Sequence, residues 1–189
     1  MSRAYRIRVR ESISQELTAS DEVCADLEVL EILPGDQMAE LLSKELKARG
    51  FEEKEGELVR TKDGVTVTVD PESGKVSVRA EKEEKVKLET EKEGWGYDDI
   101  GPRGQQVRQQ LSEQAKAELE RRSQRHQDRL QGEATEQLEK AIGDVRKELN
   151  DAVNAVTREA LKQKAAQLGQ IKEMSEDPEA GSLTIKVEV

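Results

Sequence analysis

Aromatic residues are scarce in this sequence, with one Phe, one Trp and two Tyr among 189 residues. Only 34% of the residues are hydrophobic, whereas 38% are charged. Burial of apolar surface stabilises a fold by about 25 cal/mol per Å² and must offset the conformational entropy of the chain. So little apolar material cannot enclose the whole chain in one globule. We therefore expect part of the molecule to be extended and solvated, as long helices with a narrow apolar stripe are.

Cysteine and histidine are nearly absent, which removes several kinds of chemistry. Cys24 is the only cysteine, so no intramolecular disulfide can form, and His126 is the only histidine. Metal sites that need two histidines are thereby excluded, and no second histidine is in reserve for a catalytic triad. No Gly-Lys-Ser/Thr sequence occurs, and Gly94-Trp95-Gly96 lacks the helix-opening glycine of a dinucleotide-binding loop. We predict a protein that is not an enzyme and has no cofactor or bound metal.

Long apolar runs are also missing. No stretch approaches the roughly 18 apolar residues of a membrane span, and Met1–Arg10 alternates with arginine instead of forming a signal peptide. We therefore expect a cytoplasmic protein without membrane insertion. The net charge of −10 is uneven, because Arg103–Ser175 carries a net +2 and the remainder −12. An acidic body repels nucleic acid and anionic membranes, so the predicted partners are other proteins.

Alternation of apolar and polar residues predicts several strands. The clearest are Tyr5–Arg10, Val23–Leu33, Val65–Val69, Lys75–Ala80 and Ser182–Val189. Between Asp36 and Gly50, leucines at helical spacing predict one helix that ends at the glycine. Glu81–Glu93 is so dense in charge that it reads as a linker or a ragged extension of the preceding strand.

The segment from Arg103 to Leu168 has a different character, being free of proline and rich in Gln, Glu, Arg and Ala. Its apolar residues recur every three or four positions and form a narrow seam of the coiled-coil type. The seam fails between Leu119 and Leu130, and Gly132 follows. One straight helix would be about 100 Å long at 1.5 Å per residue. The alternative is a helical hairpin whose tip lies near Gly132.

We favour the hairpin because of the C-terminal strand. A lone terminal β-hairpin is marginally stable, so Ser182–Val189 is expected to join the N-terminal sheet unless a neighbouring subunit supplies one. The predicted fold class is α+β, a small, mostly antiparallel sheet with one packed helix, interrupted by a long α-helical hairpin. Residues 1–102 and 170–189 would form the sheet domain, and 103–169 a coiled-coil-like insertion.

Two groups of residues are candidate partner contacts. The only Trp lies in the predicted loop Gly94–Pro102, where Trp95 and Tyr97 either cover the rim of the sheet core or form an aromatic contact patch. In that loop Asp98-Asp99 is read as a turn and helix entry. A basic cluster lies in the helical segment and is either a solvated helix face or a contact for an acidic partner. Its members are Arg121, Arg122, Arg125, His126 and Arg129.

Short segments carry two resemblances. Tyr97–Gly101 and Gly181–Val187 resemble motifs of a small family of chloroplast and cyanobacterial open reading frames, although there the helix is short. Ser2–Arg10 resembles the start of accessory proteins of bacterial FtsH ternary systems. Such proteins are encoded beside an FtsH-like AAA+ ATPase, a MoxR-type ATPase and a von Willebrand A protein. The resemblance implies an AAA+ ATPase as partner and brings no site residues.

The leading hypothesis is a non-catalytic accessory, adaptor or assembly subunit of an AAA+ system. One alternative is a holdase-like chaperone or coiled-coil assembly factor that forms homo-oligomers through the apolar seam. Another is a small-ligand-binding or enzymatic domain that uses the loop around Trp95 and Tyr97, which would require a pocket with convergent polar groups.

Overall fold

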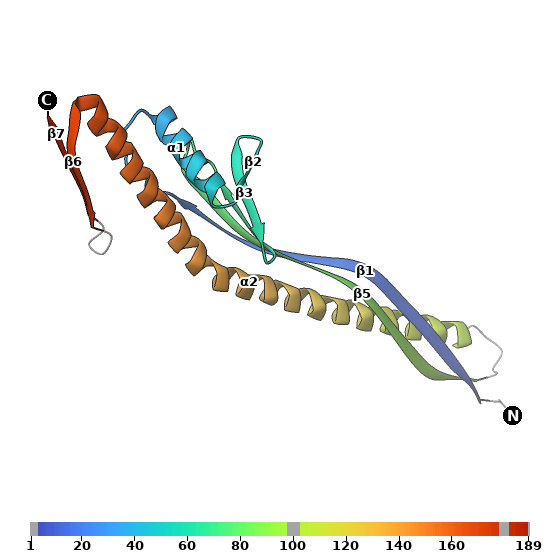
Figure 1. The fold of residues 1–189 in the computed structure, drawn as a ribbon. Helices are drawn as coiled ribbons and strands as arrows, with labels where there is room; N and C mark the ends of the chain where they lie inside the picture. Colours follow the sequence, from blue (N-terminus) through green and yellow to red (C-terminus); the bar gives the residue numbers. More distant parts are fainter. Residues whose placement is uncertain (1–3, 98–102, 178–181, 189) are drawn as a thin grey trace. The chain divides into compact units, whose positions relative to one another are not determined.

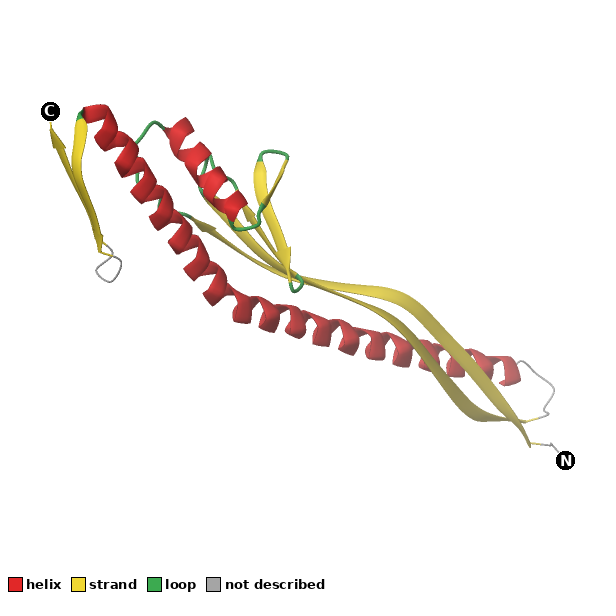
Figure 2. Cartoon of the chain, in the orientation of Figure 1, coloured by secondary structure: helices red, strands yellow, loops and turns green. Residues whose placement is uncertain are grey.

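The computed structural model describes residues 4–97, 103–177 and 182–188 (Figure 1). The α+β fold class is confirmed, with a five-stranded antiparallel sheet and a long helix (Figure 2). The elements in chain order are β1 (Ala4–Asp26), α1 (Gly35–Ala48), β2 (Glu52–Lys54), β3 (Glu57–Lys62), β4 (Val65–Val69), β5 (Lys75–Tyr97), α2 (Arg103–Leu168), β6 (Gln170–Asp177) and β7 (Ser182–Glu188).

The chain forms two compact units, and β1, β5 and α2 contribute to both. We call Met1–Asp21 with Glu81–Glu136 the ribbon unit, and Glu22–Ala80 with Gln137–Val189 the sheet unit. These boundaries differ from those of the predicted domains, which were a sheet domain of 1–102 with 170–189 and an insertion of 103–169. That division stays a prediction.

In the ribbon unit, β1 and β5 form a two-stranded antiparallel ribbon. Arg8 pairs with Glu93, and Glu16 with Lys85, so the strands run in opposite directions. Alternate residues face α2, and the apolar ones among them form a small core. Its members are Leu17 and Ala19 from β1, Val86 from β5 and Leu130 from α2. Of the two interpretations of Glu81–Glu93, the linker is wrong and the extension of the preceding strand is right, because β5 continues through this segment as a regular strand.

The sheet unit has the strand order β1-β5-β4-β3-β2. In the central pairing Val67 lies opposite Val78 on one side and Arg60 on the other. Opposed residues share a face, and this face carries the buried valines of β4 and β5. Both α1 and the second half of α2 pack on it, which forms the main core. Its largest fully buried side chains are Leu42, Leu46, Leu58, Val69 and Val156.

Helix α1 forms as the sequence predicts. Met38, Leu42 and Leu46 recur every four residues and are buried. Gly50 adopts φ +86°, a left-handed conformation that favours glycine, while the Phe51 amide donates to the Leu46 carbonyl oxygen at 3.1 Å. The helix therefore ends where the pattern places its end.

Helix α2 is one continuous helix of 66 residues, so the predicted α-helical hairpin is wrong. Gly132 lies within the helix and not at a tip. The seam does not meet a second segment of α2: it packs on strands and, in the sheet unit, shares a core with α1, and Ala134, Leu138, Leu149 and Ala152 are all buried. Where the seam fails, Arg122 and His126 meet carboxylates, as described below.

The C-terminal hairpin also differs from expectation. Strand β7 pairs with β6 in its own two-stranded sheet, so the prediction that Ser182–Val189 joins the N-terminal sheet is wrong. Ile171 lies opposite Val187, and Met174 opposite Ile185, with an irregularity between Ile171 and Glu173. This bulge brings two apolar residues three positions apart onto one face.

Candidate protein-interaction surface

Trp95 lies in strand β5, so the predicted loop is wrong for residues 94–97. Its side chain is 58% exposed, and the guanidinium carbon of Arg6 lies 5.5 Å from the ring centroid. The aromatic ring therefore does not fill the rim of the core. Tyr97 is the last residue of β5 and its side chain, like Asp98–Pro102, lies outside the described residues.

The glycines beside Trp95 have a packing role. A Cβ on Gly96 would lie 2.6 Å from Cζ of Tyr5, and one on Gly94 would lie 3.0 Å from a methyl carbon of Leu111. Both distances are shorter than ordinary van der Waals contacts, so side chains lie against the bare backbone at these positions. The Gly-Trp-Gly sequence is thus explained by close packing.

Polar side chains of α2 contact β1 along one side of the ribbon. Gln127 donates to the Thr18 carbonyl oxygen at 2.7 Å, and Gln131 donates to the Ser20 carbonyl oxygen at 3.1 Å. Thr135 contributes a further hydrogen bond to Asp21. These two backbone carbonyls belong to an edge strand, so the glutamines satisfy acceptors that would otherwise be open to another chain.

On the β5 side of the helix, Glu84 gathers two of the predicted basic residues. Arg129 forms an ion pair with Glu84, and Nδ1 of His126 lies 3.6 Å from the same carboxylate. Arg129 lowers the pKa of Glu84, chiefly by its hydrogen bond. Arg122 forms an ion pair with Glu118, one turn earlier on α2, and Lys92 of β5 reaches that carboxylate as well. Arg122, His126 and Arg129 are therefore engaged within the chain.

Arg121 and Arg125 behave differently. Both are exposed, they lie one helical turn apart, and neither has an ion-pair partner among the described residues. They border a shallow hollow of about 550 Å³ between α2 and β5. We call this hollow the basic groove; it is lined by Lys92 of β5 and by Gln114, Ala117, Glu118, Arg121, Arg122 and Arg125 of α2. The structure thus brings three of the four predicted arginines to one groove, without Arg129 or Trp95 in its lining.

Arg60 is a half-buried charge that the sequence pattern did not reveal. It occupies an apolar position of β3 and forms two hydrogen bonds with Glu148 of α2. It also donates to the Arg49 carbonyl oxygen at 3.1 Å, and its guanidinium lies 4.5 Å from the Phe51 ring centroid. The only indication is the position of this arginine, which lies opposite Val67 on the same face as Val78, among residues that are otherwise apolar. Its contacts are structural, because they join β3 to both helices.

The sheet unit has a larger hollow of about 690 Å³ between α2 and the ends of β1 and β5. Its walls are mainly aliphatic, including Val23, Leu27, Ile142, Val145 and Val153. Among the described residues no group of three or more His, Cys, Asp or Glu side chains could hold a metal ion. Within the same part of the chain, no helix is both long and apolar enough to cross a membrane.

Comparison with known protein families decides the identity of the chain. The model of the family described as FtsH ternary system domain X5 matches residues 1–189. The chain belongs to this family. The resemblance of Ser2–Arg10 to accessory proteins of FtsH ternary systems is thereby confirmed. Searches of curated proteins and of solved structures give no match.

Proposed function

We propose that the protein is a non-catalytic accessory or adaptor subunit that acts with an AAA+ ATPase of an FtsH ternary system through protein–protein contacts. Membership of the X5 family supports the association with that system. The basic groove is the observation that carries the adaptor role. Arg121 and Arg125 are exposed cations without ion-pair partners in the part of the chain that the structure describes, and the net charge of the chain is −10.

Unpaired arginines suit a contact surface for physical reasons. A guanidinium forms bidentate hydrogen bonds with carboxylates and loses little hydration when it does so. Complementary charge also steers association and fixes which partner binds. Because the groove is exposed, such a contact weakens as ionic strength rises.

The coiled-coil alternative has less support. Self-association through the apolar seam requires that seam to be accessible, but Leu119, Leu138 and Leu149 are buried within the chain. Near the end of α2, Leu161 and Leu168 are exposed and do not form a continuous seam. The enzymatic alternative needs a pocket with convergent polar groups, whereas Trp95 projects from a strand and stacks with Arg6.

Affinity purification from the native host, with mass spectrometry, tests the proposal. A tagged wild-type chain is compared with Arg121→Glu/Arg125→Glu and with the control Lys116→Glu/Lys164→Glu, which makes the same charge change at exposed sites of α2 outside the groove. Wild type and control should recover the ATPase, and the groove variant should lose it. Absence of any AAA+ ATPase from the wild-type sample overturns the proposed function.

A further inference from the structure

Strand β5 has a free edge beside the basic groove. Its neighbours in the sheet are β1 and β4, and β4 pairs only with Val76–Ala80. From Lys82 to Glu93, the edge of β5 away from β1 is therefore paired with no strand of the described residues. Unpaired backbone N–H and C=O groups on such an edge are a template for an added strand.

Helix α2 places different side chains at the two edges of the ribbon. At the β1 edge, Gln127 and Gln131 occupy backbone carbonyls. At the β5 side, Lys92 and the unpaired Arg121 and Arg125 line an open hollow. A strand added to β5 would thus lie with alternate side chains directed toward these cations.

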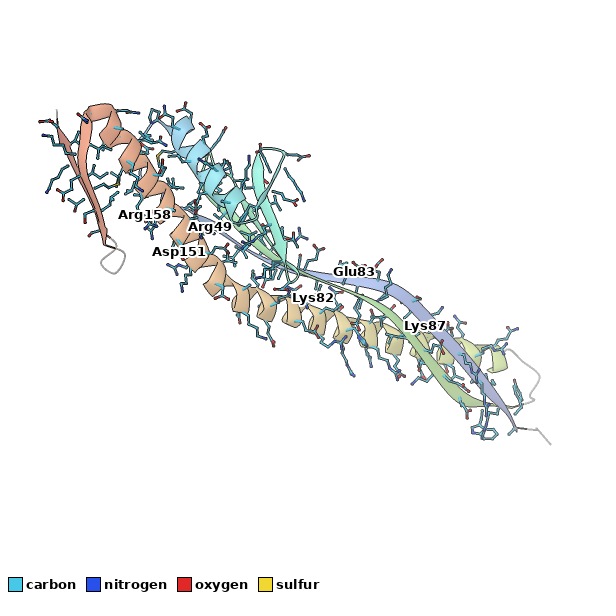
Figure 3. The ribbon with its side chains drawn as sticks, in the orientation of Figure 1. Arg49, Lys82, Glu83, Lys87, Asp151 and Arg158 are labelled. Carbon is cyan, nitrogen blue, oxygen red and sulfur yellow. The ribbon has the colours of Figure 1, made fainter. Side chains whose placement is uncertain are left out.

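We propose that an extended acidic segment of a partner protein binds in this groove as an added strand on β5. Backbone hydrogen bonds to β5 supply affinity, and the cations select carboxylates at every second residue. This inference rests on the proposed function, because it specifies which kind of segment of the partner protein the adaptor surface binds. The opposite face of β5 is mixed in charge, with Glu83 and Lys87 both on the ribbon (Figure 3), so it places little restriction on the other residues of the segment.

Charge disfavours a second copy of this chain as the occupant. Two β5 edges related by a twofold axis perpendicular to the sheet would place both helices on one face. Arg121 and Arg125 of one copy would then approach those of the other, and like charges repel. An acidic segment instead neutralises them.

The test uses the purified full chain and a short fluorescein-labelled peptide of alternating Glu and Val, with Gln/Val and Lys/Val peptides as controls. Fluorescence anisotropy should show saturable binding of the Glu/Val peptide alone. Arg121→Glu/Arg125→Glu should weaken it about tenfold or more, equivalent to roughly 1.4 kcal/mol, while Lys116→Glu/Lys164→Glu keeps the wild-type affinity. Equal affinity for all three peptides overturns the proposal.

Amide hydrogen exchange by NMR separates strand addition from simple charge attraction. Bound peptide should protect alternate amides between Lys82 and Glu93, because every second N–H points to the edge away from β1. Charge-dependent binding without protection in β5 overturns strand addition. A dimer in sedimentation whose β5 amides are already protected without peptide assigns the edge to a second copy and also overturns it.

These measurements need no ATPase, so their outcome is separate from that of the affinity purification. If the ATPase is recovered but the peptide does not bind, the proposed function stands and the proposal of an added acidic strand is rejected. If the peptide binds but no ATPase is recovered, the AAA+ partner is rejected and the groove is still supported as a site for an acidic strand.

Discussion

Arg60 and Glu148 form a two-pronged ion pair in which both nitrogen–oxygen distances are 2.5 Å, and this pair joins strand β3 to helix α2. Their side chains are only 21% and 29% exposed. Loss of one partner of a partly desolvated pair is unfavourable, because the other charge stays half-buried without its counter-ion. The pair therefore makes the position of α2 on the sheet sensitive to a single carboxylate.

Glu148→Gln should lower the free energy of unfolding by about 1–3 kcal/mol, since Arg60 keeps its charge but loses an ionised acceptor. Urea denaturation followed by circular dichroism measures the change. Glu139→Gln is the matched control, because Glu139 lies on the exposed side of the same helix and should change stability little. Equal stability of the two variants would contradict the role of the pair.

The same pair predicts a pH dependence. The Arg60 hydrogen bond lowers the pKa of Glu148 below its ordinary value, which is about 4.3 in unfolded chains. A lowered pKa means that the stabilisation is present above about pH 4.3 and is lost as pH falls through the folded-state pKa. Unfolding between pH 7 and pH 3 should therefore show a steeper loss in wild type than in Glu148→Gln. Parallel curves would contradict this.

Gly96→Ala should destabilise the ribbon unit by about 1–3 kcal/mol, because the added methyl group meets the ring of Tyr5. Gly132→Ala is a control of opposite sign: nothing lies within 4 Å of its Cβ position, and alanine favours a helix by about 1 kcal/mol. Thermal unfolding measures both. The double variant Gly96→Ala/Tyr5→Ala should lose less stability than the sum of the single changes, and simple additivity would refute the contact.

Gln127→Ala/Gln131→Ala should increase self-association, because it exposes the Thr18 and Ser20 carbonyl oxygens at the β1 edge. Light scattering over a range of concentrations follows the effect. Gln109→Ala/Gln124→Ala removes two glutamines whose side chains bond acidic residues of α2 itself, so it should remain like wild type.

Leu138→Asp/Leu149→Asp should unfold the sheet unit, since both leucines belong to its core with α1 and the sheet. An intermolecular coiled coil would respond differently, by dissociating with the strands intact. Circular dichroism together with light scattering distinguishes these results. Retention of the full β signal would contradict the intramolecular packing of the seam.

Periodicity predicted the elements whose buried faces lie within one short segment. Met38, Leu42 and Leu46 of α1 and Val65, Val67 and Val69 of β4 are buried as their spacing indicates. The long strands were harder to predict. Between Glu81 and Glu93 only Val86 and Leu88 are apolar on the covered face, because α2 meets this stretch largely through ion pairs. A narrow stripe with few apolar residues resembles a linker.

The architecture depended on which surface the seam of α2 covers, and that surface is distant in sequence. Leu130 packs against Leu17 and Val86, and Leu138 against the core of the sheet unit. The hairpin was predicted because Ser182–Val189 was expected to join the N-terminal sheet, whereas β7 pairs with β6 next to it in sequence. The arginines of the candidate surface were identifiable from the sequence. Which of them form ion pairs was not, because the partners of Arg122 and Arg129 are carboxylates of the helix itself and of β5, and Arg121 and Arg125 have no such partner among the described residues.

The glutamine bonds to Thr18 and Ser20 have a consequence for stoichiometry. A ribbon that accepted a strand at each of its two edges could join successive molecules into an open filament. Because two acceptors of the β1 edge are occupied, we expect strand addition to be disfavoured there and each chain to accept a strand only at β5. The expected assembly is therefore a closed complex of one chain with one partner segment.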